Sequence, residues 1–184
     1  MFSIGGTGWM LLFAAVAGLL CLVLGLAVGR RLGPVAGFAW FGLLWSLAVI
    51  GVVTLIPAQN GLGYVPAGEH ATSCSWDIGG PAPGGFWIFG GGQQVLNTLL
   101  FVPAGLFLVL AFARWHGGWV LVPLGLLALA AYSLGIEEIQ LHVARIDRAC
   151  DVTDIIDNVT GAAIGVLLGL LLLPVLRPWR AKRR

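Results

Sequence analysis

Five long apolar stretches constrain this sequence more than any other feature. Each is close to the roughly 20 residues that a helix needs to cross a hydrocarbon core of ~30 Å. Lipid offers the backbone no hydrogen-bond partners, and the continuous apolar runs lack the alternation of barrel strands. We therefore predict an all-α polytopic membrane protein, a single bundle over residues 1–184 with spans at about 9–29, 34–56, 95–113, 119–136 and 155–176.

Composition supports a membrane protein and excludes an ordinary soluble domain. The chain has 184 residues, of which 59% are hydrophobic and 10% charged, whereas a soluble domain carries about 25% charged residues. The net charge of +2 comes mostly from the basic tail 177–184, which suits topology control and contact with anionic lipid headgroups. We therefore expect membrane lipids as partners and no nucleic acid.

The distribution of basic residues predicts the topology. Arg30 and Arg31 follow the first span, Arg114 follows the third, and the tail follows the fifth. No Lys or Arg precedes the first span or lies in the long 57–94 loop. Because positive residues stay cytoplasmic, we expect the N-terminus and that loop outside and the C-terminus inside. Arg145 and Arg148, in the predicted outer loop 141–152, are the exceptions.

The 57–94 loop and two cysteines suggest how the outer face is organised. The loop is rich in Gly and Pro yet contains several aromatic residues, so it either rests on the outer leaflet or covers a polar face as a lid. Cys74 and Cys150 both fall in predicted extracytoplasmic loops, where disulfides persist. We hypothesise a Cys74–Cys150 bridge; the alternative is two free thiols.

Polar side chains of the last three spans are predicted to lie at one height. Measured from the cytoplasmic ends, Asn97, Glu137 and Asp154 lie about 26, 27 and 30 Å along their helices at 1.5 Å per residue. All three therefore fall near the outer boundary. Ser133, Glu137 and Gln140 also recur at i, i+4 and i+7, which places them on one helix face.

The last span carries a second polar face. Asp154, Asn158, Gly161 and Gly165 recur at i, i+4, i+7 and i+11, with Asp157 at the flank, so this face is expected to point into the bundle. The glycine spacing predicts the close approach of another helix.

Carboxylates near hydrocarbon require partners. Each costs several kcal/mol unless it is paired, protonated or faces a cavity. Arg145 and Arg148 are the expected partners, because the guanidinium group offers a carboxylate two donors. Asp151 lies in the same segment.

Pro103 and Gly105 predict a kink in the third span. Pro103 removes one helical hydrogen bond and frees the carbonyl of Leu99. The opening either lines a cavity or bends the helix to fit its neighbours.

These residues carry a resemblance to a known family. The region of about 93–170 resembles the VanZ-like family through three motifs: Asn97-x5-Pro103-x-Gly105, Ser133-x3-Glu137-x2-Gln140, and Arg148-x2-Asp151-x2-Asp154-x3-Asn158-x2-Gly161-x3-Gly165. The resemblance implies a small multi-span protein of the bacterial cytoplasmic membrane, in a family named for teicoplanin resistance. The chain departs from the family pattern at Thr153, where an acid is common, and at Asp157, where an apolar residue is common.

Three functions are consistent with the polar residues. An outer-leaflet pocket would bind a lipid headgroup, a lipid-linked cell-wall precursor or an amphiphilic antibiotic, since intramembrane ionisable residues usually serve function. A membrane enzyme would use two carboxylates as acid and base, or several to hold Mg²⁺ or Ca²⁺. A structural protein would use them as ion pairs and act through a partner. We expect no cofactor, and a divalent cation belongs only to the enzyme alternative.

Overall fold

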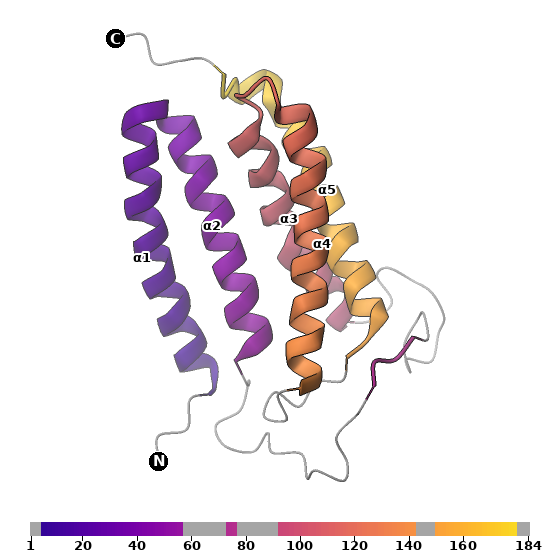
Figure 1. Cartoon of the computed structure of the whole chain (residues 1–184). Helices are drawn as coiled ribbons and strands as arrows, with labels where there is room; N and C mark the ends of the chain where they lie inside the picture. The colour runs from indigo at the N-terminus through magenta and orange to yellow at the C-terminus, as the bar shows by residue number, and fades with distance from the viewer. Residues whose placement is uncertain (1–4, 57–72, 77–91, 143–149, 180–184) are drawn as a thin grey trace.

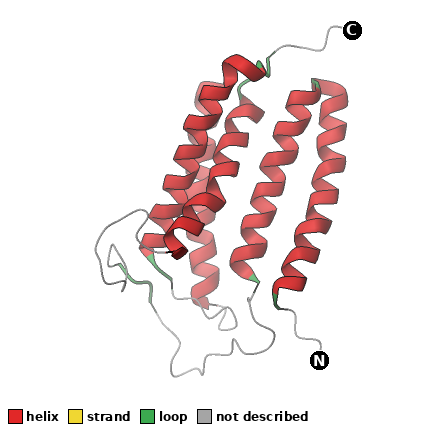
Figure 2. Cartoon of the chain, turned by 180° about the vertical axis from the view of Figure 1, so that it is seen from behind, coloured by secondary structure: helices red, strands yellow, loops and turns green. Residues whose placement is uncertain are grey.

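The computed structural model describes residues 5–56, 73–76, 92–142 and 150–179 (Figure 1). These residues form five helices: α1 (Thr7–Leu32), α2 (Pro34–Leu55), α3 (Gly92–Phe112), α4 (Gly118–His142) and α5 (Val152–Leu176). All five are long and apolar enough to cross a membrane, and Figure 2 shows that the described ranges contain no strand. The predicted five-helix bundle is confirmed.

Helices α4 and α5 extend beyond their predicted apolar spans into segments that carry acidic and amide side chains. α4 continues past the predicted span end at 136 as far as His142, and α5 begins at Val152 instead of at 155. The extra turns carry polar residues that a hydropathy window rejects, yet Glu137 and Gln140 are buried against neighbouring helices. Packing therefore extends both helices beyond the apolar segments.

The bundle has two distinct ends (Figure 1). We call the end where α2 and α4 finish and α3 and α5 begin the loop end. The opposite end, with the α1–α2 and α3–α4 turns and the end of α5, is the tail end. Helix α1 begins at the loop end, and α5 ends at the tail end (Figure 1).

The helices pack unequally. α3 and α5 make the most extensive contact, α4 packs on both, and α2 contacts α3. α1 lies at one edge of the bundle, where its main partner among the described helices is α2 (Figures 1 and 2). The third to fifth helices, which carry the predicted polar residues, therefore form one compact group.

Glycines set the distance between α3 and α5. A Cβ atom at Gly161 would lie 2.0 Å from the carbonyl oxygen of Thr98, and one at Gly165 would lie 2.1 Å from that of Val102. From the other side, a Cβ at Gly105 would lie 2.0 Å from the carbonyl oxygen of Ala162. The two helices run parallel at backbone contact, the geometry that small residues permit in membranes.

Pro103 lies on the outer surface of α3. It shares an exposed side with Leu96 and Leu99, which are 67% and 58% exposed, whereas Phe101 and Ala104 are fully buried. The side chain of Pro103 therefore faces away from the core of the described helices. The two alternatives for the opening at the carbonyl of Leu99, a cavity lining and a bend that fits the neighbouring helices, stay predictions.

Candidate polar site at the loop end of the bundle

Buried polar side chains gather at the loop end. In the described part of the chain they all belong to the last turns of α2 and α4 or the first turns of α3 and α5, except Ser46 in the middle of α2. The tail half of the bundle is filled by apolar side chains such as Phe101 and Leu108. The buried polar residues at the loop end are Thr54, Asn97, Thr98, Ser133, Glu137, Gln140, Thr153, Asp157 and Asn158.

Side chains of α4 connect this helix to its neighbours. Ser133 Oγ accepts a hydrogen bond of 2.9 Å from Asn158 Nδ2 in α5, and both side chains are buried. Gln140 Nε2 donates to the backbone carbonyl of Thr54 in α2 at 2.9 Å. Buried polar groups are strongly favoured when paired in this way, so these bonds fix α4 between α2 and α5.

The backbone amides at the start of α5 donate hydrogen bonds to acceptors within the protein. The amide of Asp151 donates to Glu137 Oε2 at 3.1 Å, and the amide of Val152 donates to the carbonyl of Ser75 at 3.1 Å. The amide of Thr153 donates to Asp151 Oδ1 at 2.8 Å, which makes Asp151 the N-cap. Two carboxylates thus stabilise the positive end of the helix dipole.

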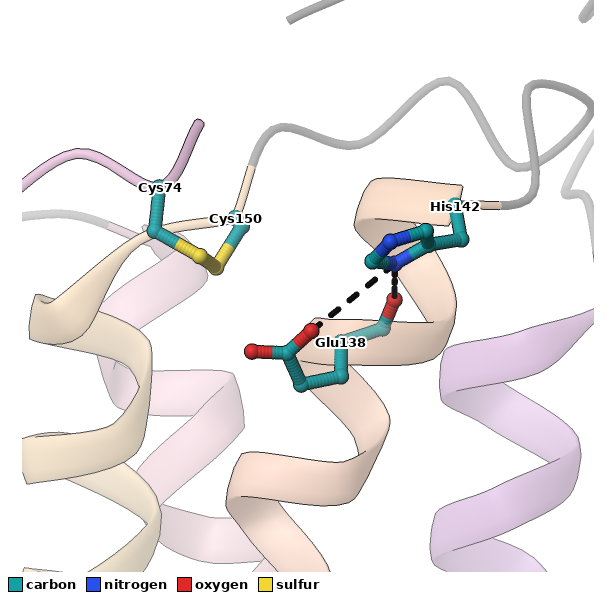
Figure 3. A network of polar contacts seen from close by, with 4 residues as sticks. All are labelled: Cys74, Glu138, His142 and Cys150. Carbon is teal, nitrogen blue, oxygen red and sulfur yellow. Dashed lines mark hydrogen bonds and ion pairs between the residues drawn. A yellow bond between two sulfur atoms is a disulfide. The ribbon is translucent and has the colours of Figure 1, made fainter. Parts of the chain in front are cut away.

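A disulfide joins the long loop to this helix end. Cys74 and Cys150 are bonded, with their Cα atoms 4.6 Å apart (Figure 3), a separation typical of disulfides. Beside it, the amide of Ser75 donates to the carbonyl of Cys150 at 2.9 Å, within a short parallel bridge between Ser75 and Asp151. Residues 73–76 are therefore attached to α5 by a covalent bond and two backbone hydrogen bonds.

The buried face of α5 differs from the predicted one. Asp157, which we placed at its flank, is 3% exposed, whereas Asp154 is only partly buried. Gly161, Gly165 and Gly169 are also buried. Asp157 lies one turn before this glycine series and continues it toward the loop end. The buried face of α5 is therefore the face that contacts α3, and the apolar pattern of the sequence did not identify it fully.

Asp157 and Thr98 each carry an unsatisfied atom. Asp157 Oδ2 and Thr98 Oγ1 are buried and have no hydrogen-bond partner. Gly161, one turn after Asp157, contacts the backbone of Thr98. Extending the α3–α5 register by one turn places Asp157 at the level of Gln94. Both unsatisfied atoms therefore lie near the start of the α3–α5 contact.

The remaining predicted residues take no part in the hydrogen bonds described above, or lie outside the described ranges. Asn97 is buried at the start of α3. The described residues do not include Arg145 or Arg148, so the ion pairs expected of these arginines stay predictions. The described ranges also exclude most of the 57–94 loop, so the lid stays a prediction. His142, expected in a loop, ends α4; its Nδ1 lies 2.8 Å from the carbonyl oxygen of Glu138 and 3.8 Å from Glu138 Oε2 (Figure 3).

The described residues contain no metal-ligand cluster, and two cavities lie away from the buried polar residues. Within the described ranges, no three His, Cys, Asp or Glu side chains are grouped closely enough to hold a metal ion. Among the cavities of the described residues, one of about 370 Å³ and one of about 380 Å³ lie toward the tail end, and none of the buried polar residues lines either one.

Thr54, Thr98 and Thr153 were absent from the predicted site. The sequence offered one signal, since Thr98 and Thr153 each adjoin a predicted polar residue or cap. A lone hydroxyl in an apolar helix bonds its own backbone as readily as a ligand, as Thr54 Oγ1 does with the carbonyl of Ile50 at 2.7 Å.

The fold and the buried polar residues define a multi-pass membrane protein with a polar interior at one end. This chain belongs to the VanZ/LLP1 family, whose model matches residues 10–173. The match covers most of the five helices and extends well beyond the 93–170 region that carried the resemblance. No curated protein and no solved structure matches the chain.

Proposed function

We propose that this VanZ/LLP1 membrane protein binds the polar part of an amphiphile at the loop end of α3, α4 and α5. The candidates are a lipid headgroup, a lipid-linked cell-wall precursor and a glycopeptide of the teicoplanin type. The single observation that carries the proposal is Asp157 Oδ2, a buried carboxylate oxygen without a hydrogen-bond partner.

A buried carboxylate oxygen without a partner is costly. Leaving such a group unsatisfied costs about 1–3 kcal/mol, and more when it is charged. A ligand ammonium or hydroxyl group would remove this cost by donating to Asp157, and the hydroxyl of Thr98 offers a second contact. Glu137 already accepts a hydrogen bond from the amide of Asp151, so Asp157 is the better acceptor for a ligand.

The arginine pattern adds an orientation to the proposal. The loop end would face the outside of a bacterial cytoplasmic membrane, with the N-terminus outside and the C-terminus cytoplasmic. Arg145 and Arg148 would then meet a phosphate group of the ligand. Asp151 and Asp154 would lie beside the same entrance, at the start of α5.

A structural role is the second candidate, and specific bonds favour it. Glu137, Gln140, Ser133 and Asn158 form hydrogen bonds within the protein that connect α2, α4 and α5. In this case the polar residues would fix the bundle, and the protein would act through a partner. The enzyme alternative, with or without a divalent cation, stays a prediction.

Ligand binding to the purified protein tests the proposal. Phosphatidylethanolamine and teicoplanin would be titrated separately while the thermal stability of the detergent-solubilised protein is followed, since a ligand of the folded state raises stability. We expect Asp157→Asn to weaken binding at least tenfold, because a hydrogen bond to a charged group contributes about 1.5–3 kcal/mol. Glu138→Gln is the matched control, since this carboxylate lies at the same end but is 54% exposed.

Two outcomes would decide against a binding site. If Asp157→Asn binds both amphiphiles as tightly as the wild type does, Asp157 takes no part in recognition and the proposed site is wrong. The structural role would be favoured by two results together. Ser133→Ala would lower the abundance of the protein in the membrane, and expression of the wild type would leave the host's susceptibility to teicoplanin unchanged.

A further inference from the structure

A groove between α1 and α2 forms a second feature, separate from the loop-end site. It encloses about 380 Å³ near the tail end, and eight of its nine lining residues are apolar or glycine. Arg30, in the last turn of α1, is the ninth. The lining residues are Leu22, Gly25, Leu26, Gly29, Arg30, Pro34, Gly37, Phe38 and Phe41.

Glycines form the floor of this α1–α2 groove. A Cβ atom at Gly37 would lie 2.5 Å from the carbonyl oxygen of Gly25 and 2.7 Å from Gly29 Cα. The two backbones therefore touch, while the larger side chains of Leu26 and Phe38 stand beside them, 55% and 58% exposed. Because α1 packs mainly on α2, the groove opens to the surroundings of the bundle, which for a membrane helix are lipid chains.

The tail end of the α1–α2 pair carries arginines and no carboxylates. Every Asp and Glu of the chain lies within 69–77 or 137–157, so neither α1 nor α2 nor their connecting turn contains a carboxylate. Arg30 and Arg31 follow one another at the end of α1, and Arg114 binds the carbonyl oxygen of Leu32 next to them. An anion that balances Arg30 must therefore come from outside this helix pair.

We propose that the α1–α2 groove binds an anionic phospholipid, with one acyl chain along the apolar walls and the phosphate at Arg30. The guanidinium group suits a phosphate because it offers paired donors. Arg30 lies in the last turn of a helix long enough to cross a membrane, and the ends of such helices lie near the lipid headgroups. This inference does not depend on the proposed function, since the two sites lie at opposite ends of the bundle.

The neighbouring arginine provides a discriminating control. Consecutive residues of a helix point about 100° apart, and Arg31 does not line the groove. A general attraction between a basic surface and anionic lipid would treat Arg30 and Arg31 alike. A groove-bound lipid would depend on Arg30 alone.

The experiment measures lipid retention by the purified full chain. Native mass spectrometry in detergent would follow titrations with phosphatidylglycerol and, separately, phosphatidylcholine of the same chain length. We expect phosphatidylglycerol to bind at least fivefold more tightly, and Arg30→Gln to remove that preference, since one basic residue near a lipid surface contributes about 1 kcal/mol. Arg31→Gln should stay within twofold of the wild type.

Filling the groove tests the acyl-chain half of the proposal. Leu26→Trp should weaken binding of both lipids at least fivefold, because the larger side chain occupies the apolar walls. Leu24→Trp is the matched control: Leu24 is 53% exposed and Leu26 55%, but Leu24 is not a groove residue. Equal effects of Arg30→Gln and Arg31→Gln, or unchanged lipid binding in Leu26→Trp, would overturn the proposal.

Discussion

A single methyl group at Gly161 tests whether the α3–α5 contact stabilises the bundle. In Gly161→Ala, the new Cβ would lie 2.0 Å from the carbonyl oxygen of Thr98 and 2.8 Å from its carbonyl carbon. Both atoms belong to the backbone of α3, so no side-chain rotation relieves the overlap. The helices must separate by about 1 Å or more before this contact becomes an ordinary one.

The expected cost follows from two opposing effects. Alanine is favoured over glycine within a helix by about 1 kcal/mol, which by itself would stabilise α5. Overpacking a tight contact costs about 1–3 kcal/mol and occasionally more. Separation of the helices at Gly161 also disturbs the adjacent contact of Gly165 with Val102. We therefore expect Gly161→Ala to lower the free energy of unfolding by about 2 kcal/mol.

The assay compares Gly161→Ala with a glycine that has free space around it. A Cβ at Gly135, in α4, would meet no atom within 4 Å apart from its chain neighbours and the backbone of its own helix, so Gly135→Ala should be neutral or slightly stabilising. Unfolding of both variants in mixed detergent would be followed by loss of helical circular dichroism as the fraction of sodium dodecyl sulfate rises. If the two variants unfold at the same detergent fraction, the reasoning about the α3–α5 contact is refuted.

Two further predictions concern the loop end. Cys150→Ser should lower the free energy of unfolding by about 2–4 kcal/mol, because it removes the disulfide that attaches residues 73–76 to α5. Thermal unfolding measures this loss. The control is Cys21→Ser, which replaces a buried free thiol. A wild-type chain whose Cys74 and Cys150 react with maleimide before reduction would contradict the disulfide. Ser133→Ala should cost about 1–3 kcal/mol because it leaves the buried amide of Asn158 without its acceptor, and a double-mutant cycle with Asn158→Leu should show coupling between the two residues.

The sequence by itself was sufficient for the number and type of helices. Apolar side chains are solvated by lipid wherever they point, so a run of about 20 of them predicts a helix without knowledge of its neighbours. The same reasoning failed at the ends of α4 and α5, where buried residues such as Gln140 carry polar groups. Burial by a neighbouring helix cannot be recognised from a hydropathy window.

The candidate site was predicted in part. The period of 3.6 residues placed Ser133, Glu137 and Gln140 on one face of α4, and all three side chains are buried. It chose Asp154 over Asp157 on α5, although Asp157 continues the spacing of Gly161 and Gly165 by one turn. Extending the glycine series toward the start of the helix would have identified Asp157 from the sequence.

Local patterns in the sequence therefore determined which segments form helices and which side of each helix is polar or small. Tertiary structure alone decided the partners: that Gly161 meets Thr98, that Asn158 binds Ser133, and that the first turn of α5 is covered by Glu137 and Ser75. The physical reason is that helix formation depends on neighbours along the chain, whereas the register between two helices depends on contacts between segments far apart in sequence.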